Sequence, residues 1–230
     1  MIDPKQFYRK MDRMLARIAS DSDQGAPLPL ITDDLVASFG EELHFDNGHL
    51  YRELYGVYEL LHTTGEKTYF PARLTDEDPA VVMLEEHGSF VYENPWEMPA
   101  WFKAEQEEYD LFVGFMLDGP PGQRYIMLFT LGSEWNREEV AFCLNGARFA
   151  LNYRLKSDAA NSEMATAAAI QRSLLPSRAP DFSGWDIAAR TEAAEAVGGD
   201  LYDFIELDSD MLGLAIGDAS GHGLPAALLG

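Results

Sequence analysis

Apolar residues near the start of the chain recur at the spacing of one helix face: Phe7, Met11, Met14, Leu15 and Ile18. Asp3 and Pro4 precede them as an N-cap followed by proline at the first helical position, which is typical of a helix start. A polar stretch at residues 20–27, with glycine and proline, predicts a loop. A second helix is expected from Thr32 to about Phe39.

From residue 42 to residue 61 the pattern changes to one typical of strands. Asn47-Gly48 between apolar runs predicts a hairpin turn, and the aromatic and β-branched run at residues 50–61 predicts the strand that follows. We expect further strands at 88–92, 110–117 and 124–130, a turn at 118–122 and a short helix at 78–86. This order of helices and strands predicts an α+β unit.

A long helical pattern begins after Asn136, which can cap the helix, with Glu139 three residues later as in a capping box. The pattern continues through an alanine-rich stretch to about residue 175, just before Pro176. A continuous helix of this extent would be on the order of 60 Å long. One small domain cannot cover it, so its apolar stripe predicts a parallel dimer through this helix. Two helices broken near Asp158 are the alternative.

The end of the chain predicts a strand at 185–190 and then a hairpin, with apolar runs at 204–207 and 211–216 on either side of residues 208–210. Acidic, glycine-framed turns stand at the two ends of this hairpin and contain Asp200 and Asp218. Because a hairpin brings its two ends together, these carboxylates are expected to lie close to each other. Hard cations such as Mg²⁺ or Mn²⁺ prefer oxygen ligands, so the pattern indicates a metal site.

Charge and cysteine content limit the classes of partner and the cellular compartment that we expect. The 230 residues include 39 acidic and only 17 basic side chains, for a net charge of −22. This argues against a nucleic-acid partner and against binding to anionic membranes, because both require clustered Lys and Arg. Cys143 is the only cysteine, and the chain has neither a signal-like start nor an uninterrupted apolar run of membrane-spanning length. We therefore expect a cytoplasmic protein.

Three motifs near the end together resemble the PPM (type 2C) family of metal-dependent protein phosphatases, in its bacterial sporulation stage II E and RsbU-like branch. They are Ile170-Gln171-Arg172-Ser173-Leu174-Leu175-Pro176, then Val197-Gly198-Gly199-Asp200-Leu201-Tyr202-Asp203, then Gly217-Asp218-Ala219-Ser220-Gly221-His222-Gly223 with Pro225-Ala226-Ala227. The resemblance covers about residues 168–230. It departs from the family at Ala193-Ala194, where Pro-Ala is common.

The resemblance implies two divalent cations, Mn²⁺ or Mg²⁺, and a metal-bound water that attacks a phosphoserine or phosphothreonine. By the family pattern Asp218 would bridge the metals, the carbonyl of Ala219 would be a ligand, and Asp200 would hold a metal directly or through water. No catalytic residue is implied beyond these metal ligands. His222 is expected to orient its turn, and the alternative for both aspartates is that they only cap turns.

Residues 33–155 resemble a GAF sensor domain in the order of their elements, with a PAS domain as the alternative. The expected fold class is α+β: a GAF-like antiparallel sheet with flanking helices, a long linker helix, and the first strands of a truncated PPM-type β-sandwich. The expected parts are residues 1–30, an N-terminal helix and loop; 31–155, the sensor domain; 156–180, the linker helix; and 181–230, the start of the phosphatase domain.

Two groups of residues in the sensor region have both a structural and a functional interpretation. An aromatic and proline cluster either packs or lines a ligand pocket, and packing is favoured: Tyr92, Pro95, Trp96, Pro99, Trp101 and Phe102. Four histidines lack metal-ligand spacing, and we expect them to be exposed or hydrogen-bonded: His44, His49, His62 and His87.

These observations predict the regulatory region and part of the catalytic domain of a bacterial signalling phosphatase. A phosphorylated anti-sigma-factor antagonist is the expected kind of substrate, by family analogy, and the sensor region could take a small-molecule ligand. The family draws further aspartates from the second half of its domain, beyond Gly230, so we expect this chain alone to be inactive. The alternative is a non-catalytic, dimerising sensor or scaffold module with a vestigial phosphatase segment.

Overall fold

The computed structural model describes residues 3–21, 28–65, 70–92, 99, 111–119, 122–132, 134–193, 196–208 and 210–220. The chain divides into two units, Met1–Asp158 (unit 1) and Ala159–Gly230 (unit 2). Each unit is described by itself below.

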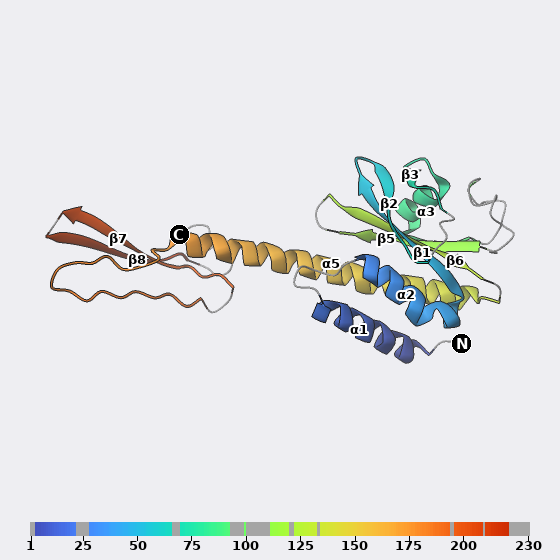
Figure 1. Cartoon of the computed structure of the whole chain (residues 1–230), viewed down its shortest axis with the longest axis horizontal. Helices are drawn as coiled ribbons and strands as arrows, with labels where there is room; N and C mark the ends of the chain where they lie inside the picture. The colour runs from blue at the N-terminus through green and yellow to red at the C-terminus, as the bar shows by residue number, and fades with distance from the viewer. Residues whose placement is uncertain are drawn as a thin grey trace. The chain divides into compact units, whose positions relative to one another are not determined.

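Unit 1 is built on an antiparallel six-stranded sheet with the strand order β3-β2-β1-β6-β5-β4 (Figure 1). Its strands are β1 (Phe45–Leu54), β2 (Val57–Thr63), β3 (Arg73–Thr75), β4 (Ser89–Val91), β5 (Leu111–Asp118) and β6 (Arg124–Leu131). The expected strands at 88–92, 110–117 and 124–130 are confirmed as β4, β5 and β6. The central strands β5 and β6 are almost entirely buried, as expected for a sheet that is covered on both faces.

Helices cover the two faces of this sheet. The helices α1 (Pro4–Asp21), α2 (Leu28–Leu43) and the first part of α5 (Arg137–Leu174) lie on one side, and α3 (Pro79–His87) lies on the other (Figure 1). Asp78 caps α3 by accepting a hydrogen bond from the Ala80 amide, and Gly88 ends the helix in the left-handed conformation. The second helix is longer than the expected span of 32–39.

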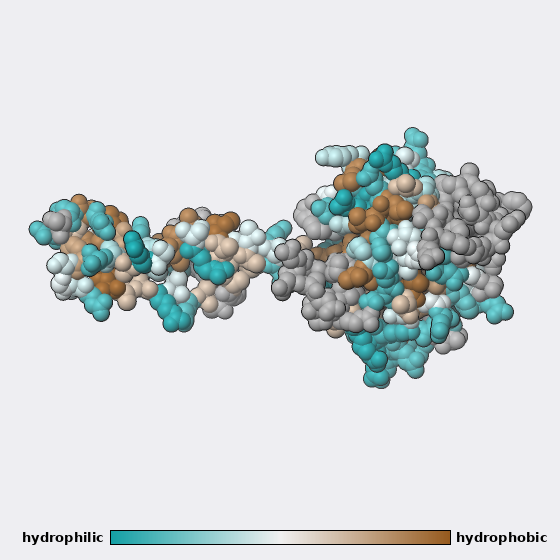
Figure 2. All heavy atoms as spheres, in the orientation of Figure 1, coloured by the Kyte–Doolittle hydropathy of each residue, from teal (hydrophilic) through white to brown (hydrophobic). Residues whose placement is uncertain are grey.

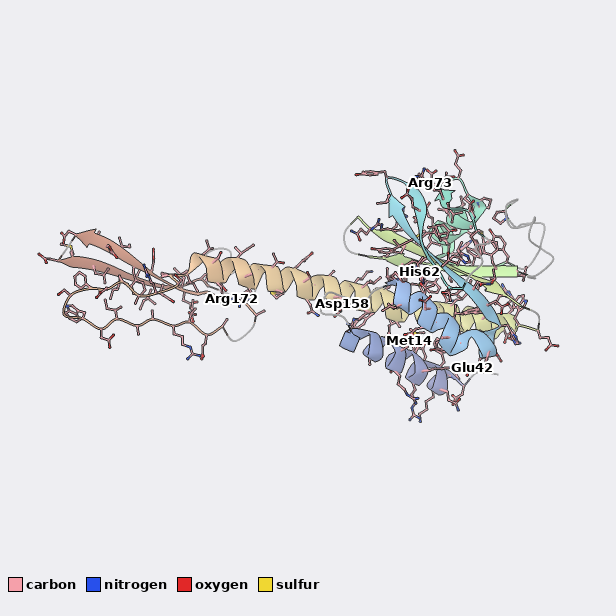
Figure 3. All side chains as sticks on the ribbon, viewed as in Figure 1. Met14, Glu42, His62, Arg73, Asp158 and Arg172 are labelled. Carbon is pink, nitrogen blue, oxygen red and sulfur yellow. The ribbon has the colours of Figure 1, made fainter. Side chains whose placement is uncertain are left out.

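Helix α1 is attached to the unit by its apolar side, through Phe7, Met11 and Met14, all of which are buried. The Phe7 ring contacts Phe39 of α2 and Phe142 of α5. Lys10 of α1 forms an ion pair with Glu42 of α2 at 2.9 Å. Figure 3 labels Met14 and Glu42 where the two helices lie side by side. The amphipathic opening helix is therefore confirmed, and it packs as part of unit 1 and not as a separate segment at residues 1–30.

The hairpin turn expected at Asn47-Gly48 is wrong, because both residues lie inside strand β1. The pairing with β6 shifts register between Phe45 and Gly48, so the strand carries a bulge here instead of a turn. A Cβ on Gly48 would lie 2.8 Å from the Thr32 Cγ2 atom and 3.2 Å from the Val36 Cγ2 atom, both on α2. Glycine is required at this position because the helix approaches the strand closely.

The actual turn between β1 and β2 is at Tyr55-Gly56. Both residues have positive φ angles, 54° and 80°, as a two-residue type I′ hairpin requires. The expected single strand at residues 50–61 is thus divided between β1 and β2. Tyr55 is fully exposed at the tip, so its aromatic side chain does not mark a buried strand position.

Helix α5 is continuous from Arg137 to Leu174, which confirms the long helix and not the break near Asp158. Its cap is also confirmed, because the Asn136 Oδ1 atom accepts a hydrogen bond from the Glu139 amide at 3.1 Å. Cys143 lies on its buried side, where burial raises the pKa of the thiol to about 12 and leaves it un-ionised. None of the helices in the described ranges combines the length and apolarity needed to cross a membrane.

Unit 2 contains the end of α5 and a hairpin of β7 (Asp200–Asp208) and β8 (Met211–Asp218). The strand expected at residues 185–190 is wrong: the segment is not paired with another strand among the described residues, and Trp185 is 73% exposed. Leu214 and Ile216 of the hairpin are also exposed. Figure 2 shows brown, apolar patches on the surface of this unit. The first strands of a β-sandwich would have such faces, but the described residues do not form a sandwich.

Candidate functional site

The two acidic turns meet at the open end of the β7–β8 hairpin. Asp200 and Asp218 are the first residue pair of its ladder, directly opposite each other. Directly opposite residues in an antiparallel pair project to the same face with their Cβ atoms about 5 Å apart. The expected proximity of these two carboxylates is therefore confirmed, whereas their role as metal ligands stays a prediction.

Gly199 lies next to Asp218 and Ala219 at the end of the hairpin. The Ala219 amide donates to the Gly199 carbonyl oxygen at 3.0 Å, which extends the ladder by one bond past the strands. A Cβ on Gly199 would lie 2.6 Å from the Ala219 carbonyl oxygen and 2.9 Å from the Asp218 Oδ1 atom. Only glycine leaves this space open, and two hard oxygen donors border it.

The first motif contacts the second through the amide of Gln171, near the end of α5. Its Oε1 atom accepts from the Gly198 amide at 3.1 Å, and its Nε2 atom donates to the Gly198 carbonyl oxygen. Figure 3 labels the next residue, Arg172, on the last turn of the helix. Val197, which precedes Gly198, is buried in a small cluster with Ala167 and Ala168 of α5.

A second contact joins the same two motifs, because the Tyr202 hydroxyl donates to the Pro176 carbonyl oxygen at 3.3 Å. The three motifs are thus brought together at Gly198 and Gly199, although 27 residues separate Gln171 from Gly198. The sequence indicated Gln171 as part of a motif. The predicted helix that continues to about residue 175 already placed Gln171 on its last turn, whereas the contact with Gly198 was not predicted.

The charge around this point is strongly negative. No lysine or arginine follows Arg190 in the chain, while β7 alone contains Asp200, Asp203, Glu206 and Asp208. Such an arrangement raises the local concentration of cations. Within the part of the chain that the structure describes, no three His, Cys, Asp or Glu side chains gather closely enough to hold a metal on their own.

A cavity of about 500 Å³ lies beside the hairpin, between residues 187–192 and strands β7 and β8. Asp200, Tyr202 and Ile216 are among its lining residues, and Ile216 is 92% exposed. The candidate metal position therefore borders an open, partly apolar surface.

Unit 1 has a second cluster of interest, on the face of its sheet that is opposite α2. His49 is fully buried there, and neither ring nitrogen has a hydrogen-bond partner among the described residues. The expectation that His49 is exposed or hydrogen-bonded is wrong, because the strand holds it among aromatic rings. His62 meets the expectation: its Nε2 atom lies 2.7 Å from Asp33 Oδ1.

Several residues singled out from the sequence lie outside the described ranges: His222 and the rest of the third motif after Ser220, together with Pro95, Trp96, Trp101 and Phe102. Tyr92 of the aromatic cluster is described and packs at 4.7 Å from Phe90 and 4.9 Å from Phe112. For this residue packing is confirmed.

Comparison with solved structures identifies the fold of unit 1. The GAF domain of an Acinetobacter phosphoenolpyruvate-protein phosphotransferase superposes with a TM-score of 0.50 and 14% identity, covering 71% of this chain and 99% of that one. Unit 1 has the GAF fold. The reduced form of fRMsr of Staphylococcus aureus superposes on the chain with a TM-score of 0.51 and 9% identity, over 67% of this chain and 98% of that one. At these identities the likeness of the GAF unit is one of fold alone.

Comparison with curated proteins finds two partial matches. Phosphoserine phosphatase RsbU of Bacillus subtilis is 39% identical over 67 residues, which is 29% of this chain and 20% of that protein. Protein IcfG of Synechocystis is 42% identical over 59 residues, 26% of this chain and 9% of that protein. The chain thus matches only a fifth or less of these relatives' length. No family model matches the chain.

Proposed function

We propose that this chain is the sensor region and the first part of the catalytic domain of a metal-dependent protein serine/threonine phosphatase. The observation that carries the proposal is the meeting of the three motifs at Gly198 and Gly199, beside the Asp218 and Ala219 oxygens. The partial similarity to a phosphoserine phosphatase supports the same reaction class. The GAF fold of unit 1 supports a regulatory role for the part of the chain that precedes the catalytic segment.

The described oxygen donors match part of a site for a pair of Mg²⁺ or Mn²⁺ ions. Asp218, the Ala219 carbonyl and Asp200 would hold them, because hard cations take carboxylate and carbonyl oxygens and Gly199 leaves the space between two of these donors open. Bound cations of this kind lower the pKa of water and neutralise charge on phosphoryl oxygens.

Two groups of contacts position these donors. Gln171 holds the Gly198 peptide through both its amide and its carbonyl group, and the ladder bond from Ala219 to Gly199 fixes the two turns against each other. Because Gln171 belongs to α5, any change in that helix acts directly on the turn that precedes Asp200. Helix α5 begins in the GAF unit, so it is the route by which a sensor signal would reach the site.

The substrate in this proposal is a protein carrying phosphoserine or phosphothreonine, such as a phosphorylated anti-sigma-factor antagonist in a bacterial signalling pathway. The chain acts as a homodimer through α5, and the GAF unit takes a small-molecule ligand. Both partners are proposed from the exposed side chains of α5 and from the fold of the sensor unit.

The test is Mn²⁺-dependent release of phosphate from a phosphoserine protein, by this chain and by a version that continues past Gly230. Asp218→Asn in the active form should lower turnover at least about 100-fold, because it removes a carboxylate that would hold the metal ions. Asp210→Asn is the matched control, since Asp210 lies at the far turn of the hairpin. Equal turnover in Asp218→Asn rejects the site, and no activity in either chain favours the scaffold alternative.

A further inference from the structure

The basic residues of this acidic chain are concentrated in its first helix. Helix α1 holds five of the 17 Lys and Arg residues of the chain and only two of its 39 acidic residues. The helix therefore has a net charge of +3, whereas all other residues together have a net charge of −25. Such a local reversal of charge is typical of a binding surface.

Three of these basic side chains form one row on the outside of α1. Lys5, Arg9 and Arg13 follow each other at intervals of four residues, so they share one face of the helix and are about 6 Å apart along its axis. All three are exposed, and the opposite face holds the buried side chains of Phe7 and Met11. Figure 2 shows teal, hydrophilic atoms along the lower side of unit 1, where Figure 1 places α1.

This row has no acidic partner within the described part of the chain. The ion pair that α1 does form, between Lys10 and Glu42 at 2.9 Å, comes from another side of the helix. Within the described residues, the side chains of Lys5, Arg9 and Arg13 form no ion pair. Like charges four residues apart repel each other and destabilise a helix. The row therefore fits a surface that obtains its counter-charges from a partner.

The apolar side of α1 is not available to a membrane. Amphipathic helices bind a bilayer by burying their apolar face at the boundary between headgroups and acyl chains. In α1 this face is packed into unit 1, where Phe7, Met11 and Met14 are each 3% exposed or less. A flat anionic surface would also meet the carboxylate of Asp12, which is exposed beside the row. Both observations disfavour a lipid partner.

The basic surface is also too narrow for a nucleic-acid duplex. Stable binding to a duplex requires several phosphate contacts, on the order of 6–10. The row is one residue wide, and the neighbouring helix α2 contains four acidic residues and no Lys or Arg. A narrow row of this kind matches a partner whose negative charges are also in a line.

We propose that the outer face of α1 is a docking surface for an acidic helix of a partner protein, with Asp or Glu at intervals of four residues. The carboxylates of such a helix repeat at the same spacing of about 6 Å, so successive ion pairs can form side by side. The guanidinium groups of Arg9 and Arg13 can each donate two hydrogen bonds to a carboxylate. The inference goes beyond the proposed phosphatase reaction and uses none of its residues.

The negative charge of the whole chain does not prevent this contact. At an ionic strength of 0.15 M, exposed charges more than about 8 Å apart are largely screened, so an acidic helix on α1 interacts mainly with the row itself. The acidic remainder of the chain disfavours binding of the same helix elsewhere. Because exposed ion pairs each contribute little, we expect a dissociation constant of about 0.1–1 mM.

The test measures the binding of synthetic peptides to the complete 230-residue chain by NMR. The probe is an alanine-based peptide of about 18 residues, long enough to form a helix, with glutamate at every fourth position. It should shift the amide resonances of Lys5, Arg9 and Arg13. A peptide with glutamine in place of glutamate should not shift them. A rearranged peptide of the same composition, with its glutamates spread around the helix, should bind at least about threefold more weakly.

Charge reversal on the row tests which residues bind the peptide. Arg9→Glu with Arg13→Glu should weaken binding by about tenfold or more, because two attractive pairs become repulsive. Arg73→Glu with Arg178→Glu is the matched control, since it changes the net charge equally at two exposed positions outside α1. The control should keep the affinity of the unmodified chain. All of these side chains are exposed, so circular dichroism should stay the same in both variants.

Equal binding of the glutamine peptide or the rearranged peptide, shifts that lie outside α1, or an equal loss in the control variant would each overturn the proposal. Phosphatidylcholine vesicles with about one third phosphatidylserine, and a DNA duplex of about 20 base pairs, are titrated in parallel. Tighter binding to either of these than to the acidic peptide, lost in Arg9→Glu with Arg13→Glu, would assign the row to a membrane or a nucleic acid instead. None of these readouts depends on phosphate release, so a failure here is distinguishable from a failure of the proposed function.

Discussion

At the residue scale, the Gln171 amide makes the closest link between helix α5 and the acidic turns. Gln171→Ala would leave the Gly198 amide and carbonyl without their side-chain partners, and the turn before Asp200 would lose its support. An unmet pair of polar groups of this kind costs about 1–3 kcal/mol. We expect Mn²⁺ affinity in the active form to fall roughly tenfold, measured by titrating metal-dependent phosphate release.

Ser173→Ala is the matched control for this change. Ser173 lies two residues further along α5, and its hydroxyl donates a hydrogen bond to the Ile170 carbonyl oxygen of its own helix. A Gln171→Ala protein with the metal affinity of the Ser173→Ala protein would show that the contact does not position the turn.

The buried imidazole of His49 makes the stability of the fold depend on pH, in a direction that follows from its burial. Its folded pKa is lowered to about 4 from an ordinary 6.5, so the unfolded chain binds a proton at a pH where the folded chain does not. The free energy of unfolding is therefore highest above pH 6.5, and it falls as the pH drops toward 4 because protons bind to the unfolded chain. Between pH 7 and pH 5 this amounts to about 2 kcal/mol.

Urea unfolding of the unmodified chain and of His49→Phe at both pH values isolates this effect, because the other titrating groups are common to the two proteins. The gap in unfolding free energy should widen by about 2 kcal/mol at the lower pH. A constant gap would mean that His49 finds a partner or solvent in the folded state.

At the element scale, the attachment of α1 depends on a close approach to α5. A Cβ on Gly146 of α5 would lie 2.6 Å from the Phe7 Cε1 atom. The Phe7 ring is held between Phe39 and Phe142, so it has little freedom to move. Overpacking of this kind costs about 1–3 kcal/mol, against roughly 1 kcal/mol gained by alanine over glycine in a helix.

A double-mutant cycle separates these two effects. We expect Gly146→Ala to destabilise the native chain by about 1 kcal/mol in urea unfolding, and the same change to stabilise a Phe7→Ala chain by up to about 1 kcal/mol. The sign should therefore reverse between the two backgrounds. A destabilisation of equal size in both would show that the helices do not depend on this contact.

Elements with a strong local pattern were predictable from the sequence, and those defined by distant contacts were not. The periodicity of Phe7, Met11 and Met14 was sufficient to predict α1, and the Asn136 cap was sufficient to predict where α5 begins. Asn47-Gly48 has the composition of a turn, yet the bond to Thr130 and the approach of α2 place both residues inside a strand. Tertiary contacts decided the outcome there, as they often do for strands.

The same distinction applies to the candidate site. The proximity of Asp200 and Asp218 follows from hairpin geometry alone, so the sequence could predict it. The Gln171 contact joins residues 27 positions apart, and the isolation of His49 depends on rings from several strands and a coil. No local pattern contains these relationships.

At the scale of the whole molecule, α5 has apolar residues on more than one side. Val140, Leu144 and Leu151 face the core of the GAF unit, whereas Phe149 and Tyr153 are 75% and 72% exposed. Phe149 and Tyr153 stand four residues apart and therefore share one face of the helix. Two large exposed aromatic rings at this spacing are typical of a helix that packs against a second copy.

We therefore expect the chain to be a dimer and Phe149→Ser with Tyr153→Ser to weaken it by about 100-fold or more, as for the loss of central interface anchors. Sedimentation equilibrium measures the change, and circular dichroism should stay the same because neither side chain is in the core. Val82→Ser, which removes an exposed apolar side chain from α3, should leave the dimer intact. If the unmodified chain sediments as a monomer at high concentration, α5 does not pair with a second copy, and a signal from the GAF unit would have to reach Gln171 within a single chain.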